Sequence, residues 1–187
     1  MSDIENRGSG AGGENTNRNG IRLEEKTRET ISGIVETMGL SSEYNSGTRS
    51  WKVEEVTYQG DTYIRCPETA FKLFEDKEGN SDVPQAHGAK EPDDLLVNKV
   101  TKTINWIESK VQNGSGSVVE KLQTASEKIE NLKRRFPGWN INYVYVLSSY
   151  FREHAQWEIS RLDEKNILYI FEDDEDFEGK LMDYSFK

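Results

Sequence analysis

The chain has 187 residues, the usual size of one folded domain, and a formal net charge of −10. It contains no run of 18 apolar residues and no secretory signal pattern, so we expect neither a membrane span nor secretion, and a cytoplasmic location. The one cysteine, Cys66, excludes an internal disulfide and a cluster of thiolate zinc ligands.

Charge is unevenly distributed along the chain. Between residues 99 and 135, eight Lys and Arg residues stand against four Asp and Glu residues, a local excess of +4. Between residues 163 and 187, nine acidic residues stand against three basic ones, a local charge of −6. The overall charge argues against a non-specific nucleic-acid binder, but the basic segment could hold DNA locally. We expect the acidic run at 172–178 to be a solvated tail that lies away from such a cleft.

Composition divides the chain into three parts. Residues 1–19 are rich in Gly, Ser and Asn and have almost no apolar side chains to bury, which predicts a flexible tail. Residues 20–171 carry the apolar patterns of a single folded domain. Residues 172–187 form an acidic C-terminal segment.

The first half of the domain begins with a predicted helix. Apolar residues recur at helical spacing over 21–38, and Gly39 follows as a natural stop. Short runs at 51–53, 56–58 and 62–66 predict strands. The pattern at 67–75 does not distinguish a helix from other structure.

The second half alternates strands with helices. The expected strands cover residues 94–100, 103–111, 141–147 and 166–171. The expected helices cover residues 118–136 and 150–162, and Ser117 with Glu120 has the pattern of a capping box before the first of them. This order predicts an α/β protein with a central mixed sheet flanked by helices.

Two acidic residues and a lysine fall on two consecutive predicted strands. Pro92-Asp93 opens one strand, and Glu108-Ser109-Lys110 lies in the next. Side chains alternate along a strand, so Glu108 and Lys110 share a face, and pairing of the two strands can bring Asp93 beside Glu108. Two facing carboxylates attract a hard divalent cation such as Mg²⁺, which can make a bound water nucleophilic toward a phosphodiester. Lys110 could hydrogen-bond that water and the phosphate.

This arrangement resembles the active-site signature of the PD-(D/E)xK nuclease superfamily. The segments Asn17–Glu24 and Lys110–Leu122 are similar to the corresponding parts of many type II restriction endonucleases. The resemblance implies a restriction endonuclease-like core with the order α-β-β-β-α-β. It also implies Asp93, Glu108 and Lys110 as catalytic residues, and Asp93 and Glu108 as Mg²⁺ ligands. Ser109 departs from the family, which usually has an apolar residue at this position.

The resemblance extends to residues outside the motif. Glu24, on the first helix, would be a further ligand of the metal. Gln112, Ser115 and Ser117 would contact the substrate, the two serines from a glycine-rich loop that can offer backbone amides to phosphate.

Each of these residues also has a plain structural interpretation. Asp93 after a proline can be a turn residue, and Asp94 competes with it for the role of the carboxylate at the strand entry. Glu108 and Lys110 can form an exposed ion pair, and Glu24 can be an ordinary acid in the first turn of a helix. The glycine-rich loop can be a connector.

The sequence therefore predicts a Mg²⁺-dependent, sequence-specific endonuclease of the type II restriction kind, acting on double-stranded DNA. We expect a homodimer, because two-fold dimers usually read palindromic sites, and a cognate DNA methyltransferase in the same system. The alternatives are a structure-specific or repair nuclease of the same superfamily and a non-catalytic acidic interaction protein.

Overall fold

The computed structural model describes residues 14–37, 44–45, 50–51, 54–66, 68–84, 91–113 and 117–186. Its centre is a six-stranded mixed sheet with the order β3-β4-β5-β6-β7-β8. These strands are β3 (Glu54–Tyr58), β4 (Asp61–Arg65), β5 (Asp94–Asn98), β6 (Thr103–Lys110), β7 (Asn140–Leu147) and β8 (Leu168–Phe171). A separate two-stranded sheet pairs β1 (Tyr44–Asn45) with β2 (Ser50–Trp51).

The direction of the strands changes across the sheet. Strands β3 to β6 pair antiparallel, whereas β6, β7 and β8 run parallel to one another. The parallel connections require crossovers, and helices supply them. The carboxyl ends of β6, β7 and β8 consequently meet at one edge of the sheet, together with the beginning of the antiparallel strand β5.

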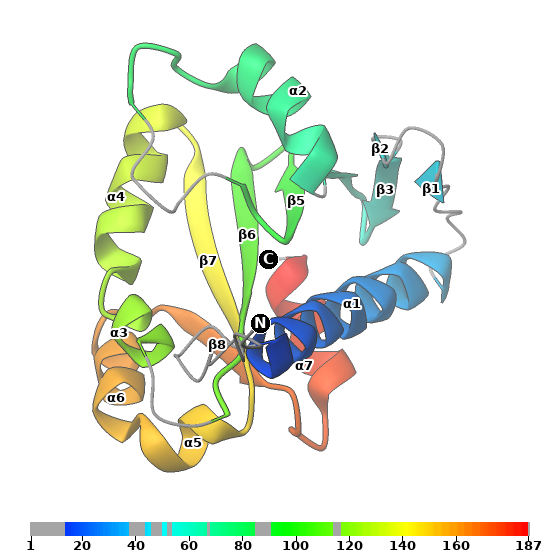
Figure 1. The fold of residues 1–187 in the computed structure, drawn as a ribbon. Helices are drawn as coiled ribbons and strands as arrows, with labels where there is room; N and C mark the ends of the chain where they lie inside the picture. The colour runs from blue at the N-terminus through cyan, green and yellow to red at the C-terminus, as the bar shows by residue number, and fades with distance from the viewer. Residues whose placement is uncertain are drawn as a thin grey trace, which may run out of the picture.

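Helices cover both faces of the sheet (Figure 1). They are α1 (Glu14–Thr37), α2 (Glu68–Glu78), α3 (Val118–Leu122), α4 (Ala125–Arg135), α5 (Tyr150–His154), α6 (Gln156–Glu164) and α7 (Phe177–Ser185). Side chains of alternate strand positions form one apolar core with α2 and α4, and another with α1 and α7. The expected α/β class, with a mixed sheet between helices, is confirmed.

The N-terminal helix is longer than predicted. It begins at Glu14, so residues 14–19 of the expected tail are helical, while residues 1–13 lie outside the described part of the chain. The undecided segment at 67–75 is also mostly helical, because α2 runs from Glu68 to Glu78 and buries Phe71 and Phe74. The predicted strand at 51–53 is described only at Trp51, the last residue of β2.

The single helix predicted over 118–136 is wrong. A turn at Gln123–Thr124 separates α3 from α4, and the Thr124 hydroxyl donates to the Lys121 carbonyl at 2.9 Å. Such a local bond competes with the backbone bonds that would continue the helix. The capping box is also wrong, because the Ser117 side chain makes no capping hydrogen bond to α3 among the described residues. The helix predicted over 150–162 divides similarly at Ala155.

The acidic C-terminal segment is not a solvated tail. Three apolar side chains in and beside α7, those of Phe177, Leu181 and Phe186, are buried against the face of the sheet that α1 also covers. Charged residues between them face outward, so the composition hides an amphipathic helix. The segment 172–186 is therefore part of the folded domain.

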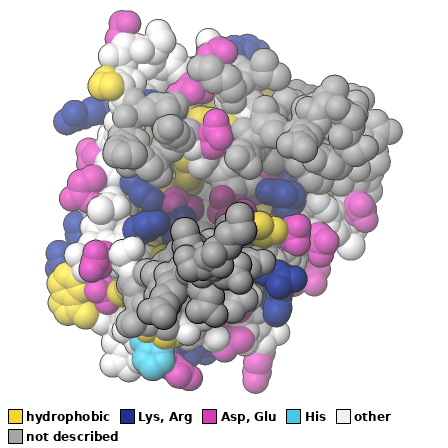
Figure 2. All heavy atoms as spheres, in the orientation of Figure 1, with side chains coloured by type: hydrophobic (Ala, Val, Ile, Leu, Met, Phe, Trp, Pro, Cys, Tyr) yellow, Lys and Arg dark blue, Asp and Glu magenta, His cyan; other side chains and the backbone are white. Residues whose placement is uncertain are grey.

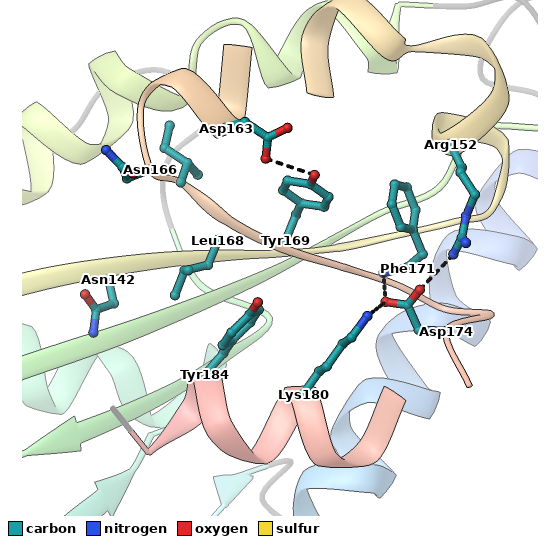
Figure 3. A pocket seen from close by; sticks show the side chains of 11 residues that line it. Asn142, Arg152, Asp163, Asn166, Leu168, Tyr169, Phe171, Asp174, Lys180 and Tyr184 are labelled. Carbon is teal, nitrogen blue, oxygen red and sulfur yellow. Dashed lines mark hydrogen bonds and ion pairs between the residues drawn. The ribbon is translucent and has the colours of Figure 1, made fainter. Parts of the chain in front are cut away.

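The acidic run begins at the end of the sheet where the carboxyl ends of the parallel strands meet. Lys110, Leu147 and Phe171 are register partners on β6, β7 and β8, so Glu172 starts two strands away from Lys110, roughly 10 Å at the usual strand spacing. The run therefore starts near the end of the sheet that carries the motif, and its position relative to bound DNA stays a prediction. Figure 3 shows why the charge is tolerated: Asp174 accepts from Arg152 and Lys180, both at 2.8 Å.

Candidate active site

The PD and ExK segments meet in the register of β5 and β6. Asp94 and Ile107 are the terminal register partners of this antiparallel pair, and one step further Asp93 lies opposite Glu108. The Asp93 amide donates to the Ile107 carbonyl at 3.1 Å, which extends the ladder to this position. Opposite residues of an antiparallel pair share a face, so the two carboxylates lie on the same side of the sheet.

A second bond fixes the Asp93 side chain. Its Oδ2 accepts a hydrogen bond of 2.6 Å from the backbone amide of Ser109, between Glu108 and Lys110. The Lys110 ammonium forms an ion pair with Glu108 Oε1. Asp93, Glu108 and Lys110 are thus brought together at one end of the sheet, and the side chains of Lys110 and Glu108 are only 18% and 11% exposed.

The electrostatics of Asp93 reflect this crowding. The pKa of Asp93 is raised from 3.8 to about 7, chiefly by burial. The negative charges of Glu24 and Glu108 add to the increase, while Lys110 and the Ser109 amide oppose it. The raised pKa of this carboxyl therefore reflects mainly its removal from water, to which the neighbouring carboxylates add. A cation bound beside Asp93 would favour its ionised form.

The structure separates Asp93 from its competitor Asp94. Asp94 is 1% exposed and forms an ion pair with Arg65, whose Nη2 lies 2.5 Å from Asp94 Oδ2. The same guanidinium donates to Ser32 Oγ at 2.9 Å and to the Arg28 carbonyl at 3.1 Å, both on α1. Asp94 thus joins the sheet to α1 on the opposite face, and it does not belong to the candidate site.

Ser109, which departs from the sequence pattern that the segment resembles, contacts α1. Its side chain is 6% exposed, and its hydroxyl lies 3.4 Å from the Thr27 hydroxyl. Thr27 also donates to the Leu23 carbonyl at 2.8 Å. Because α1 offers a polar partner here, a serine can replace the usual apolar residue without an unpaired buried hydroxyl.

Glu24 lies one turn before Thr27 on α1, and its charge reaches Asp93. Among the described residues, however, no three His, Cys, Asp or Glu side chains are placed to hold one metal ion together. The pair Asp93 and Glu108 is sufficient for Mg²⁺, which binds through one or two carboxylates and keeps several waters. The chemistry of these two carboxylates is compatible with this ion, although each Glu108 oxygen within reach is paired with a lysine in this structure.

Gln112, Ser115 and Ser117, the three residues expected to contact substrate, differ in how the structure places them. Gln112 is 4% exposed, and its backbone amide donates to Ser148 Oγ at 3.2 Å, which gives it a structural role at the end of β6. Ser115 lies outside the described residues. Ser117 is exposed before the five-residue helix α3.

Sequence reasoning missed one charged residue of the site. Lys128 on α4 is 7% exposed, and its ammonium lies 3.0 Å from Glu108 Oε1 and 3.2 Å from Oε2. A signal was available, because Lys128 falls on the buried stripe of the helix that includes Ala125 and Leu132. Lysine is rarely buried unless it is paired, so its position on that stripe indicates a buried acid nearby.

Tyr145 on β7 is the other residue that the motif does not include. It is the register partner of Glu108, and its hydroxyl is buried without a hydrogen-bond partner among the described residues. Burial raises the pKa of the Tyr145 phenol, and the Glu108 charge raises it further, so the group stays neutral.

The face of the molecule shown in Figure 2 has a hollow surrounded by charged side chains. In Figure 2, Lys and Arg side chains gather around a depression near the middle of the molecule, and Asp and Glu side chains lie deep within it. A separate pocket lies around β8 and is lined by Tyr169, Tyr184, Arg152, Lys180 and other residues (Figure 3). There Asp174 binds both cations, and Asp163 accepts from the Tyr169 hydroxyl at 3.0 Å. That pocket is distinct from the carboxylate pair.

No described helix has the length and apolar content that crossing a membrane requires. No family model, curated protein or solved structure matches the chain.

Proposed function

We propose that this protein is a Mg²⁺-dependent endonuclease that hydrolyses phosphodiester bonds of double-stranded DNA. The observation that carries the proposal is that Asp93, Glu108 and Lys110 lie together at one end of the sheet. The backbone amide of Ser109 donates to the Asp93 carboxylate, and Lys110 pairs with Glu108. Stability alone does not explain the group, because burying charges costs energy that an apolar trio would not. Strongly shifted pKa values of this kind cluster at functional sites.

Each residue has a distinct task in this proposal. Asp93 and Glu108 bind the cation, and the Ser109 amide keeps Asp93 oriented toward it. When bound, Mg²⁺ supplies acidity to the attacking water and neutralises charge on the phosphate. Lys110 is the more exposed of the two lysines at Glu108, so its ammonium can turn from this carboxylate to the phosphate that is cleaved.

The topology supports a restriction endonuclease-like core. The elements α1, β4, β5, β6, α4 and β7 match, in chain order, the helix–strand–strand–strand–helix–strand core of the PD-(D/E)xK nucleases. In this match β1, β2 and β3 lie between α1 and β4, α2 lies between β4 and β5, and α3 lies between β6 and α4. In this correspondence Asp93 precedes the second strand of the core, and Glu108 and Lys110 lie on the third. We extend the proposal to site-specific cleavage of the type II restriction kind on the sequence resemblance at Asn17–Glu24 and Lys110–Leu122. A homodimer and a cognate methyltransferase belong to the same proposal.

The experiment is digestion of a supercoiled plasmid of known sequence with purified protein, in Mg²⁺ or in EDTA. We expect discrete fragments in Mg²⁺ only, with ends that map to one short sequence. Glu108→Gln should abolish cleavage, whereas Glu130→Gln, an exposed acid on α4, should leave it unchanged.

The other outcomes contradict parts of the proposal. Cleavage confined to branched or damaged DNA would indicate a repair nuclease. DNA binding without cleavage in Mg²⁺ or Mn²⁺ would indicate an interaction protein.

A further inference from the structure

Glu108 contacts two lysines, one more than the motif contains. The Lys110 ammonium pairs with Oε1 and also donates to the Ser109 carbonyl at 3.2 Å, whereas the Lys128 ammonium contacts both carboxylate oxygens, at 3.0 and 3.2 Å. The Lys128 side chain is 9% exposed, half the value of Lys110. The two ammonium groups therefore differ in how freely they can leave the carboxylate.

The position of Lys128 makes its bond to Glu108 difficult to replace. It projects from the inward stripe of α4, and its ammonium lies 5.9 Å from the centre of the Tyr143 ring. A buried ammonium needs a negative partner, and Glu108 is the carboxylate that it contacts. Water cannot easily take the place of that partner at this depth.

We propose that Lys128 is an internal counter-cation of Glu108 that competes with a divalent metal ion for this carboxylate. The inference rests on the metal site of the proposed function. A fixed positive charge at 3.0 Å from a ligand oxygen repels a second cation, so the free protein binds the metal weakly. Substrate phosphates then add the negative charge that draws Lys110 outward and strengthens metal binding.

The test is calorimetric titration of Mn²⁺ into the metal-free protein without DNA. Lys128→Met removes the charge and keeps the length of the side chain, and it should tighten Mn²⁺ binding roughly tenfold. Lys128→Arg keeps the charge and should bind like the wild type. Lys165→Met is the matched control, because the Lys165 ammonium also contacts α4, through Ser126 at 2.7 Å, and its variant should bind Mn²⁺ like the wild type.

A second neutral variant guards against loss of the fold. If circular dichroism shows that Lys128→Met does not fold, Lys128→Gln replaces it with the same expectation. Unchanged or weaker Mn²⁺ binding in the folded neutral variant would overturn the inference, as would the absence of Mn²⁺ binding by every variant at millimolar concentration. Glu108→Gln added to the neutral variant should remove the gain in affinity, and a persistent gain would show that Lys128 competes elsewhere.

The outcomes for Lys128 and for the nuclease are separable. A wild type that cleaves DNA, with no gain in Mn²⁺ affinity on neutralising Lys128, would retain the nuclease and reject the counter-cation. Tighter Mn²⁺ binding by the neutral variant, with no cleavage by the wild type, would retain the counter-cation and reject the nuclease.

Discussion

The Asp93 carboxylate accepts a hydrogen bond of 2.6 Å from the backbone amide of Ser109. This bond is made by a side chain, outside the regular ladder of β5 and β6, and it reaches the centre of the Glu108-Ser109-Lys110 segment. It holds Asp93 at a fixed position relative to the side chains on either side of Ser109. Such orientation by neighbouring groups is what a catalytic site requires before its substrate arrives.

Lys110→Ala should abolish most cleavage and leave DNA binding nearly unchanged. An ammonium placed at the developing charge of a transition state is typically worth ~10²–10³ in rate. The measurement is single-turnover cleavage in Mg²⁺, with a gel-shift assay in Ca²⁺ for binding. Lys165→Ala, at an exposed lysine away from the carboxylates, is the control. Normal cleavage by Lys110→Ala would contradict a catalytic role for Lys110 and leave the Glu108–Lys110 ion pair as a structural feature only.

Asp93→Asn should stabilise the metal-free protein at pH 8 and not at pH 4. Since the folded pKa of Asp93 is about 7, the native state retains this proton to a higher pH than the unfolded chain. The group's contribution to stability is complete below its unfolded value of 3.8 and is lost as pH rises through 7. Asparagine avoids that loss and can still accept from the Ser109 amide.

The expected gain at pH 8 is on the order of 1–3 kcal/mol. Urea unfolding in EDTA at both pH values measures it, and Glu130→Gln should show no such dependence. An equal effect of Asp93→Asn at both pH values would mean that this carboxyl titrates normally. In Mg²⁺ the gain from Asp93→Asn at pH 8 should shrink, because only the wild type gains stability from the bound ion.

Arg65→Met should destabilise the fold strongly. The substitution leaves the Asp94 carboxylate buried without its cation and removes the bonds to Ser32 and Arg28 on α1. Breaking one side of a buried ion pair costs about 3–5 kcal/mol. Urea unfolding should show this loss, whereas Arg161→Met, at an ion pair with exposed partners, should cost less than about 1 kcal/mol. A similar small loss for both variants would contradict the structural role of Asp94.

Leu181→Ala tests whether the acidic segment belongs to the domain. Leu181 is fully buried in α7, and truncation of such a side chain costs about 2–5 kcal/mol. Asp183→Ala, on the exposed side of the same helix, should change the unfolding free energy by less than about 0.5 kcal/mol. If Leu181→Ala unfolds at the wild-type urea concentration, α7 does not contribute to the core.

The proximity of Asp93, Glu108 and Lys110 was predictable because it depends on local geometry. Alternation places Glu108 and Lys110 on one face, and a short connection between two strands favours antiparallel pairing with a register near that observed. The order of most strands and helices followed in the same way from hydrophobic periodicity. Boundaries moved where a side chain competed with the backbone, as Thr124 does between α3 and α4.

Three features were decided by the tertiary structure. Asp94 was a candidate for the site until its pairing with Arg65 and α1 placed it on the other face. Residues 172–187 read as a solvated tail, because the few apolar side chains of α7 become a buried face only when the sheet is present to cover them. Lys128 lies 20 residues from Glu108, and only the crossover from β6 to β7 brings α4 over that carboxylate. The sequence by itself determined which side chains share a face of a strand or a helix, since that depends on the spacing of residues within a few positions. The partners of a buried charge depend on which elements pack together, and that is a property of the whole fold.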